Sequence, residues 1–146
     1  MTANNIESGT HQAEDELAKW IGLYQQVQLP SSYESWVHRS FADLIAARGR
    51  FFRAEPWAIP EPHPGRQGQC FRAANEWADR QGWIYVEGFA FLPTAPVFMS
   101  VIDYAWCLTE NGHVADPALE DGQADGYFGV PVTHDFRRQR RIRRGA

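Results

Sequence analysis

Cysteine is scarce in this sequence, and long apolar runs are missing. The 146 residues include only two cysteines, Cys70 and Cys107, which are too few for a disulfide framework or a four-cysteine zinc site. No stretch approaches the length of a membrane-spanning helix, and no basic segment followed by an apolar one opens the chain as in a signal peptide. We therefore expect a cytoplasmic protein with reduced thiols, and we assign it no metal and no cofactor.

Basic residues are also scarce, except at the C-terminus. Residues 1–136 contain 8 basic and 18 acidic residues, whereas the last ten, RRQRRIRRGA, contain six arginines and no acid. Such a tail can bind nucleic acid or an anionic surface, but a specific nucleic-acid reader would need a further basic patch on the body. We favour a solvated tail that rests on the acidic body, and we expect neither nucleic acid nor a membrane as partner.

The sequence is rich in apolar and aromatic residues. Hydrophobic residues make up 44% of the chain and aromatic residues 14%, with six Trp, nine Phe and five Tyr. A chain of this length suits one domain that buries about 70% of its unfolded surface. We predict a flexible N-terminus over residues 1–11, one domain over residues 12–136 and the basic tail over residues 137–146.

The predicted helices come first and the predicted strands follow. Apolar spacing of three and four residues predicts helices over residues 12–29, 31–48 and 70–81. Alternating or continuous apolar runs predict strands over residues 51–53, 83–92, 98–109 and 113–116. A last run, GYFGVPV, is predicted to be an edge strand because Pro131 lacks a backbone donor. This order predicts an α+β domain in which the helices pack on an antiparallel sheet.

Cys70 stands at the predicted start of the third helix, after a long loop rich in proline and glycine. The free N–H groups and the positive dipole end of a helix N-terminus favour the thiolate, which is the nucleophilic form of cysteine. Gln67 and Gln69, just upstream, could donate hydrogen bonds to an oxyanion. The alternative is that Cys70 is a small buried hydrophobic residue, as cysteines usually are. We interpret Cys107 in that second way, as packing within a strand.

A cysteine nucleophile needs a base, and no residue is an obvious candidate. His63 lies in the loop seven residues before Cys70, and His113 follows the glycine of a predicted hairpin turn, so both are possible substitutes. Glu87 falls on an aromatic face of its strand, where a buried carboxylate could act as an acid or a base. The alternative is that this face is partly exposed, or that an arginine such as Arg72 satisfies Glu87.

Five short motifs occur in a fixed order along the chain. They are Cys70 at a helix start, YVEGFA at 85–90, YAW at 104–106, VADPA at 114–118 and YFGVPV at 127–132. In this order they resemble the papain-like and transglutaminase-like cysteine enzymes. They look most like small phage and bacterial proteins of that type with YVEGYA, HAW and VVDPT-like segments. The resemblance covers residues 65–132 and implies that Cys70 is the nucleophile and Asp116 the acid that orients the base.

The histidine of the resembled enzymes falls on Tyr104 in this sequence. A phenol is a poor base at neutral pH, but it could donate a hydrogen bond to an oxyanion or orient a substrate, with Trp106 helping to position it. Whether Asp116 meets Tyr104 depends on the hairpin. A two-residue turn at Asn111 and Gly112 turns Asp116 away, whereas a three-residue loop with a glycine bulge brings it to the same face. The resemblance favours the second arrangement.

Two functions from different classes therefore stay open. The first is a cysteine-dependent acyltransferase or hydrolase, acting on a peptide, a protein or a small amide or ester, with Cys70 as nucleophile. Asp116, Glu87 and Tyr104 would then position groups around it. The second is a catalytically inactive relative that binds a protein or a small ligand. The order of the motifs favours the first function, and the missing histidine favours the second.

Overall fold

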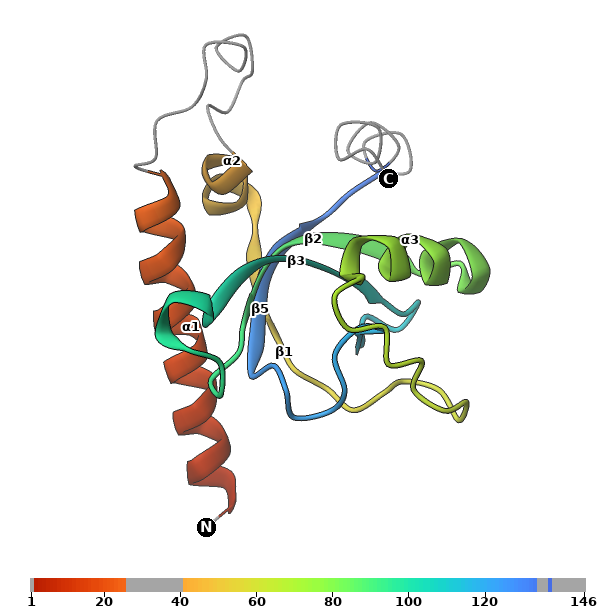
Figure 1. Cartoon of the computed structure of the whole chain (residues 1–146), viewed down its shortest axis with the longest axis horizontal. Helices are drawn as coiled ribbons and strands as arrows, with labels where there is room; N and C mark the ends of the chain where they lie inside the picture. Colours follow the sequence, from red (N-terminus) through yellow and green to blue (C-terminus); the bar gives the residue numbers. More distant parts are fainter. Residues whose placement is uncertain (1, 26–40, 134–136, 138–146) are drawn as a thin grey trace, which may run out of the picture.

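The computed structural model describes residues 2–25, 41–133 and 137, with the backbone alone for 2–10 and 41–44 (Figure 1). Most of the second predicted helix and nearly all of the basic tail lie outside these residues. The elements in chain order are α1 (Thr2–Gln25), α2 (Phe41–Arg48), β1 (Arg50–Arg53), α3 (Cys70–Gln81), β2 (Ile84–Phe91), the 3-10 helix η2 (Val97–Met99), β3 (Val101–Leu108), β4 (Val114–Ala115) and β5 (Gly126–Pro131).

The five strands form one antiparallel sheet, curled into a half-barrel, in the order β1-β5-β2-β3-β4. The two longest strands, β2 and β3, pair along their whole length, from Ile84 opposite Leu108 to Phe91 opposite Val101. Because successive side chains of a strand point to opposite faces, the strands contribute apolar residues to cores on both faces of the sheet. With its helices packed on this sheet, the chain is an α+β protein, as its sequence predicts.

Both long helices cover the same face of the sheet, α1 over one end and α3 over the other (Figure 1). The first core joins α1 to the sheet through Leu17, Ile21, Phe89, Phe91 and Val101. The second joins α3 to the sheet through Ala74, Trp77, Ala78, Tyr85, Ala105 and Cys107. The opposite face carries the third core, with Phe52, Val86, Tyr104, Trp106 and Tyr127. Tyr104 and Cys107 therefore belong to different faces of β3.

The Cys70-bearing helix has the bounds that the sequence predicts. Its buried residues, Ala73, Ala74, Asn75, Trp77 and Ala78, recur at helical spacing, and charged residues occupy the outer side. Gly82 follows the last turn with a φ of 70°, a left-handed conformation that glycine adopts without steric cost. The small side chains of Ala74 and Ala78 let α3 pack closely against β3, and this packing positions the helix, including Cys70, relative to the sheet.

The strand β5 is not at the edge of the sheet, contrary to the sequence-based prediction. It lies between β1 and β2, where Gly129 is opposite Arg50 on one side and Gly88 on the other. Pro131 is tolerated because β1 begins at Arg50, whose partner on β5 is Gly129, so the pairing with β1 stops two residues before Pro131. The backbone N–H of the next residue, Val132, donates to Tyr85, so the missing donor of Pro131 faces the side that β1 leaves open.

Two predicted boundaries also differ from the structure. The helix α1 begins at Thr2, ten residues before the predicted start, in a segment that contains no proline. Arg137, which we assigned to the solvated tail, is buried, and its guanidinium contacts the carbonyl of Asn75 at 3.2 Å and the carboxylate of Asp79 at 2.6 Å. The folded domain therefore includes Arg137, since that guanidinium satisfies two acceptors on α3.

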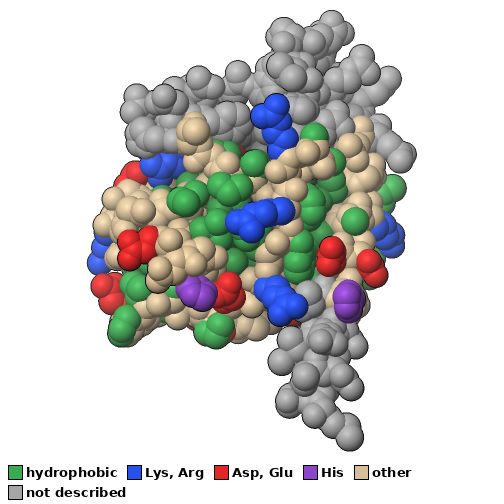
Figure 2. Space-filling view, turned by 180° about the vertical axis from the view of Figure 1, so that it is seen from behind, with side chains coloured by type: hydrophobic (Ala, Val, Ile, Leu, Met, Phe, Trp, Pro, Cys, Tyr) green, Lys and Arg blue, Asp and Glu red, His purple; other side chains and the backbone are tan. Residues whose placement is uncertain are grey.

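The lengths of the helices and the distribution of surface charge can be compared with what a membrane or nucleic acid would require. None of the helices within residues 2–25, 41–133 and 137 is long and apolar enough to cross a bilayer. On the side shown in Figure 2, the basic and acidic side chains of the described residues are interspersed rather than gathered by sign. A single-sign field of the kind that binds nucleic acid is not formed on that side by the described residues.

Candidate functional site

The hairpin between β3 and β4 brings Asp116 to Tyr104. Cys107 pairs with Ala115, and the Thr109 N–H donates to the His113 carbonyl at 2.9 Å. The loop between Thr109 and His113 therefore contains three residues, 110–112. The structure thus shows the second of the two arrangements that the sequence left open. The Tyr104 hydroxyl lies 2.7 Å from Oδ1 of Asp116 and 2.9 Å from Oδ2. Residue 104 and the acid are in direct contact, as the resemblance implies.

Asp116 is buried and receives hydrogen bonds from three further donors. The Tyr127 hydroxyl donates to Oδ2 at 2.8 Å, and the backbone N–H groups of Ala118 and Leu119 donate to Oδ1 at 3.0 and 3.1 Å. Burial raises the pKa of Asp116, while the hydroxyls of Tyr104 and Tyr127 and the two N–H groups oppose that rise. The carboxylate therefore joins β3, β5 and the segment after β4 in one buried polar cluster.

The Cys70 thiol lies beside this cluster, partly buried at the first residue of α3. Burial raises the pKa of Cys70 to about 11, and the carboxylates of Asp116 and Asp103 add to the rise. The backbone N–H groups of Ala105 and Phe71 donate toward the sulfur and oppose the rise, but they do not outweigh burial. Cys70 is therefore a neutral thiol at physiological pH, although it lies at a helix N-terminus.

Tyr104 cannot take the place of an imidazole base for this thiol. Burial raises the pKa of Tyr104 far above its ordinary value, and the Asp116 charge adds to the effect. Its hydroxyl proton is already held by the Asp116 carboxylate, so the phenol has no tendency to become the anion that would accept a proton. Its side chain stacks on Trp106, with ring centroids 6.5 Å apart, which holds the phenol in this orientation.

His63 is close to the site through the backbone of Asp116. Its Nε2 lies 2.7 Å from the Asp116 carbonyl oxygen, and its Nδ1 lies 2.8 Å from the Gly65 N–H. Because an N–H can only donate, Nδ1 is the acceptor, and Nε2 carries the proton that binds the carbonyl. Both ring nitrogens are therefore engaged, and His63 fastens the loop before α3, together with a 3.1 Å bond from Arg66 to the Pro117 carbonyl.

Three other predicted residues make contacts away from Cys70. His113 stands at the hairpin loop, where its Nδ1 is 2.6 Å from the Glu55 carboxylate. The side-chain amide of Gln67 donates to Gln123 at 3.0 Å. The side-chain oxygen of Gln69 accepts two hydrogen bonds from the Arg66 guanidinium, at 3.0 and 2.8 Å. The side chains proposed as oxyanion donors thus make exposed contacts, Gln67 with another loop and Gln69 within its own loop.

Glu87 and Trp106 are both fully buried, on opposite faces of the sheet. Glu87 is opposite Ala105, on the helix-covered face, and does not join the Asp116 cluster on the other face. Trp106 packs against Tyr127 at 4.8 Å and Phe52 at 5.8 Å between ring centroids. Its indole Nε1 has no hydrogen-bond partner among the described residues. Trp106 thus supports the cluster by packing, and Cys107, buried with its thiol 3.2 Å from the Ala74 carbonyl, packs as predicted.

The sequence-based prediction missed two contributors to this cluster. Tyr127 belongs to one of the five motifs, but its spacing gives no sign that its hydroxyl reaches Asp116 eleven residues earlier. The backbone donors had a local signal, because an aspartate before a proline commonly accepts N–H groups two and three residues ahead. Among the described residues, no group of three or more His, Cys, Asp or Glu side chains could hold a metal ion.

Comparisons with other proteins give no family for this chain. No protein-family model matches it, and neither the curated proteins nor the solved structures contain a match. The assignment of a function therefore depends on the geometry around Cys70 and Asp116.

Proposed function

We propose that this protein is a catalytically inactive relative of the papain-like and transglutaminase-like enzymes that serves as a binding module for a protein or a small ligand. The contact between Tyr104 and Asp116 carries the proposal. In a working cysteine enzyme the acid orients an imidazole, which takes the proton of the thiol. In this chain the acid holds a phenol, which keeps its own proton.

The ionisation of Cys70 supports the same conclusion. A thiol with a pKa of about 11 is present as thiolate in only about one molecule in 10⁴ at pH 7. An activated cysteine needs the opposite balance, in which a cationic partner outweighs burial. The charges that act on Cys70 are the carboxylates of Asp116 and Asp103, and both disfavour the thiolate.

The contacts of Asp116 are those of a structural residue. Its carboxylate accepts bonds from strands β3 and β5 and from the turn that follows β4. Such a cluster stabilises the fold even when no reaction takes place, because each buried donor would otherwise be left without a partner. The scaffold can therefore keep its acid after the loss of the base.

Acyl transfer at Cys70 is the second candidate function. The N–H groups of Ala105 and Phe71 that point toward the sulfur favour it, since donors of this kind also stabilise an oxyanion. In that mechanism the thiolate adds to an amide or ester carbonyl, and the amine or alcohol leaves as it takes up the proton removed from the thiol. The thioester that results passes its acyl group to water or an amine, which regenerates the thiol. It requires a proton acceptor for the thiol, and His63 would have to release the Gly65 N–H from Nδ1, its only unprotonated nitrogen, to act as one.

Alkylation of Cys70 by iodoacetamide separates the two candidates. For the inactive module we expect alkylation at pH 7 to be at least about 100 times slower than that of glutathione, and to accelerate toward pH 11. Mass spectrometry assigns the adduct, and Cys70→Ser measures any contribution from Cys107. A Cys70 rate equal to or above that of the free thiol at pH 6–7 would overturn the proposal and favour the enzyme.

A further inference from the structure

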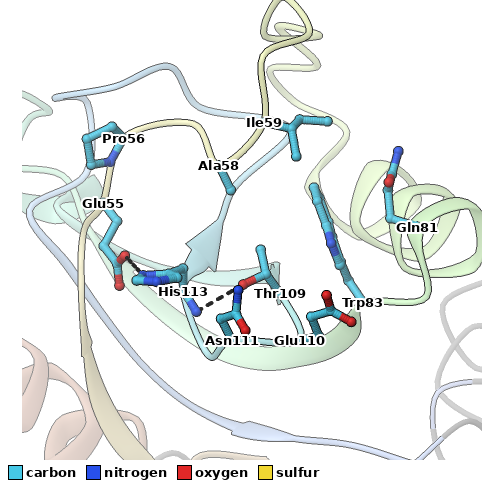
Figure 3. Close-up of a pocket in the computed structure, with 10 residues that line it drawn as sticks. All are labelled: Glu55, Pro56, Ala58, Ile59, Gln81, Trp83, Thr109, Glu110, Asn111 and His113. Atoms are coloured by element: carbon cyan, nitrogen blue, oxygen red, sulfur yellow. Dashed lines mark hydrogen bonds and ion pairs between the residues drawn. The ribbon is translucent and has the colours of Figure 1, made fainter.

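A second hollow lies away from Cys70, at the loop end of the β3–β4 hairpin. It has a volume of about 510 Å³ and opens between the segment after β1, the hairpin loop and the start of β2 (Figure 3). Ligand sites in proteins commonly enclose about 300–1,000 Å³. Its lining combines an indole, two carboxylates and small apolar side chains. This combination indicates the chemistry of an occupant.

Trp83 forms one wall of this pocket and is held rigidly from behind. One side of its ring stacks on Trp77, with centroids 5.8 Å apart and planes 19° from parallel, and Trp57 packs edge-on at 5.9 Å. Figure 3 shows the indole standing upright with its other face toward the hollow. An aromatic face presented in this way attracts a cation, above all a flat one that can stack on it.

The charged groups around the hollow are acidic. Glu110 lines it from the hairpin loop and Glu55 from the segment after β1, and none of its lining residues is a lysine or an arginine. Glu55 is held in place by His113, whose Nδ1 lies 2.6 Å from one carboxylate oxygen, and by the Val114 N–H at 3.4 Å from the other. The Glu55 carboxylate is therefore held in a fixed position, whereas Glu110 lies on the exposed hairpin loop.

We propose that this pocket binds a guanidinium group carried on a hydrocarbon arm, such as the side chain of arginine. The planar guanidinium stacks on Trp83 and directs its N–H donors to Glu110 and Glu55. Ile59 and Pro56 provide apolar contacts for the methylene arm. The site involves neither Cys70 nor Asp116, so the inference is independent of whether Cys70 is reactive.

Isothermal titration calorimetry of the full chain with N-acetyl-arginine amide tests the proposal. We expect saturable binding with a Kd of about 1 mM or tighter. The matched probe is N-acetyl-citrulline amide, which has the same shape without the charge, and we expect it to bind at least about five times more weakly. Equal affinity for the two probes would overturn the proposal, and so would the absence of binding by the arginine probe at 10 mM.

Variants of the protein locate the binding. Glu110→Gln, on an exposed loop, should weaken binding about threefold, and Trp83→Leu about three- to tenfold. Glu14→Gln on α1 is the control, since it removes the same charge from an exposed position of another element. If Glu14→Gln weakens binding as much as Glu110→Gln, the attraction is due to net charge and the site is disproved. Glu110→Gln decides the case if Trp83→Leu does not fold.

A third probe, agmatine, distinguishes an arginine residue of a protein partner from a small guanidinium compound with a free amine. Its free ammonium would add a second charge to an acidic pocket, whereas the amide probe imitates a residue within a peptide. Tighter binding of the amide probe indicates an arginine in a protein partner, and tighter binding of agmatine indicates a free amine. Both results support the guanidinium site and differ only in what carries the group.

Discussion

The hydroxyl of Tyr104 lies 2.7 Å and 2.9 Å from the two carboxylate oxygens of Asp116, in a buried part of the protein. A histidine at position 104 would let this acid orient a base toward Cys70. The tyrosine instead donates its one hydroxyl proton to the acid and has no ring nitrogen that could accept a proton from the thiol. The contact therefore joins the buried acid to a phenol that keeps its own proton.

Replacing Tyr104 with histidine should activate Cys70. In Tyr104→His, Asp116 can hold an imidazole, whose cationic form stabilises the thiolate, so the pKa of Cys70 should fall. We expect alkylation by iodoacetamide at pH 7 to be at least about 10 times faster than in the native protein. Tyr104→Phe is the control, because it removes the hydroxyl without adding a base, and its alkylation should stay slow. Equal rates in the two variants would show that position 104 does not act on the thiol.

Removing the Asp116 carboxylate should destabilise the fold strongly. Asp116→Ala leaves two tyrosine hydroxyls and two backbone N–H groups without their acceptor, and we expect the free energy of unfolding to drop by about 3–5 kcal/mol. Tyr127→Phe removes a single donor and should cost about 1–2 kcal/mol. Urea unfolding followed by circular dichroism measures both. Similar losses in the two variants would contradict a cluster centred on the carboxylate.

Stability should fall in alkaline solution partly because of Cys70. The folded protein raises the pKa of this thiol from 9.0 to about 11, so it binds the proton more tightly than the unfolded chain does. The stabilisation is complete below pH 9 and is lost as the pH rises toward 11. Tyr104 and Tyr127, whose pKa values are also raised by burial, add to the loss above pH 10.

Urea unfolding at pH 8, 9, 10 and 11 measures this dependence. In Cys70→Ser, which has no thiol to ionise, the free energy of unfolding should decline less between pH 9 and pH 11, by about 1 kcal/mol or more. Parallel curves for the native protein and Cys70→Ser would mean that the folded protein does not shift the ionisation of Cys70.

The close pairing of β2 with β5 should tolerate no side chain at Gly88. A Cβ atom there would collide with the carbonyl oxygen of Phe128 and with the Cα of Gly129. Gly88→Ala should therefore lower the free energy of unfolding by about 3 kcal/mol or more, because both obstacles are backbone atoms of a central strand.

Gly22→Ala on α1 is the matched control for that substitution. A Cβ atom at Gly22 meets nothing within 4 Å, so alanine should stabilise the helix by about 0.5–1 kcal/mol. Thermal or urea unfolding of the two variants should shift in opposite directions. A stable Gly88→Ala variant would contradict the close pairing of β2 with β5.

Local features of the fold could be predicted from the sequence with good bounds. The helix that begins at Cys70 and ends before Gly82 follows from apolar spacing and a glycine stop, and both are properties of neighbouring residues. The strands β2 and β3 were also predicted, although β3 begins at Val101 and not at residue 98, because Val97–Met99 form a 3-10 helix. The position of β5 could not be predicted, since it depends on where the distant strand β1 begins relative to Pro131.

The sequence alone determined the residue types at the candidate site: a cysteine at a helix start, a tyrosine where a base would be expected, and an aspartate before a proline. Only the tertiary structure decided that Tyr104 and Tyr127 both donate to Asp116, and that His63 holds the carbonyl of the same residue. It also decided that the thiol is too buried to ionise near neutral pH. The physical reason is that hydrogen-bond partners and burial come from contacts between distant segments, which no local spacing records.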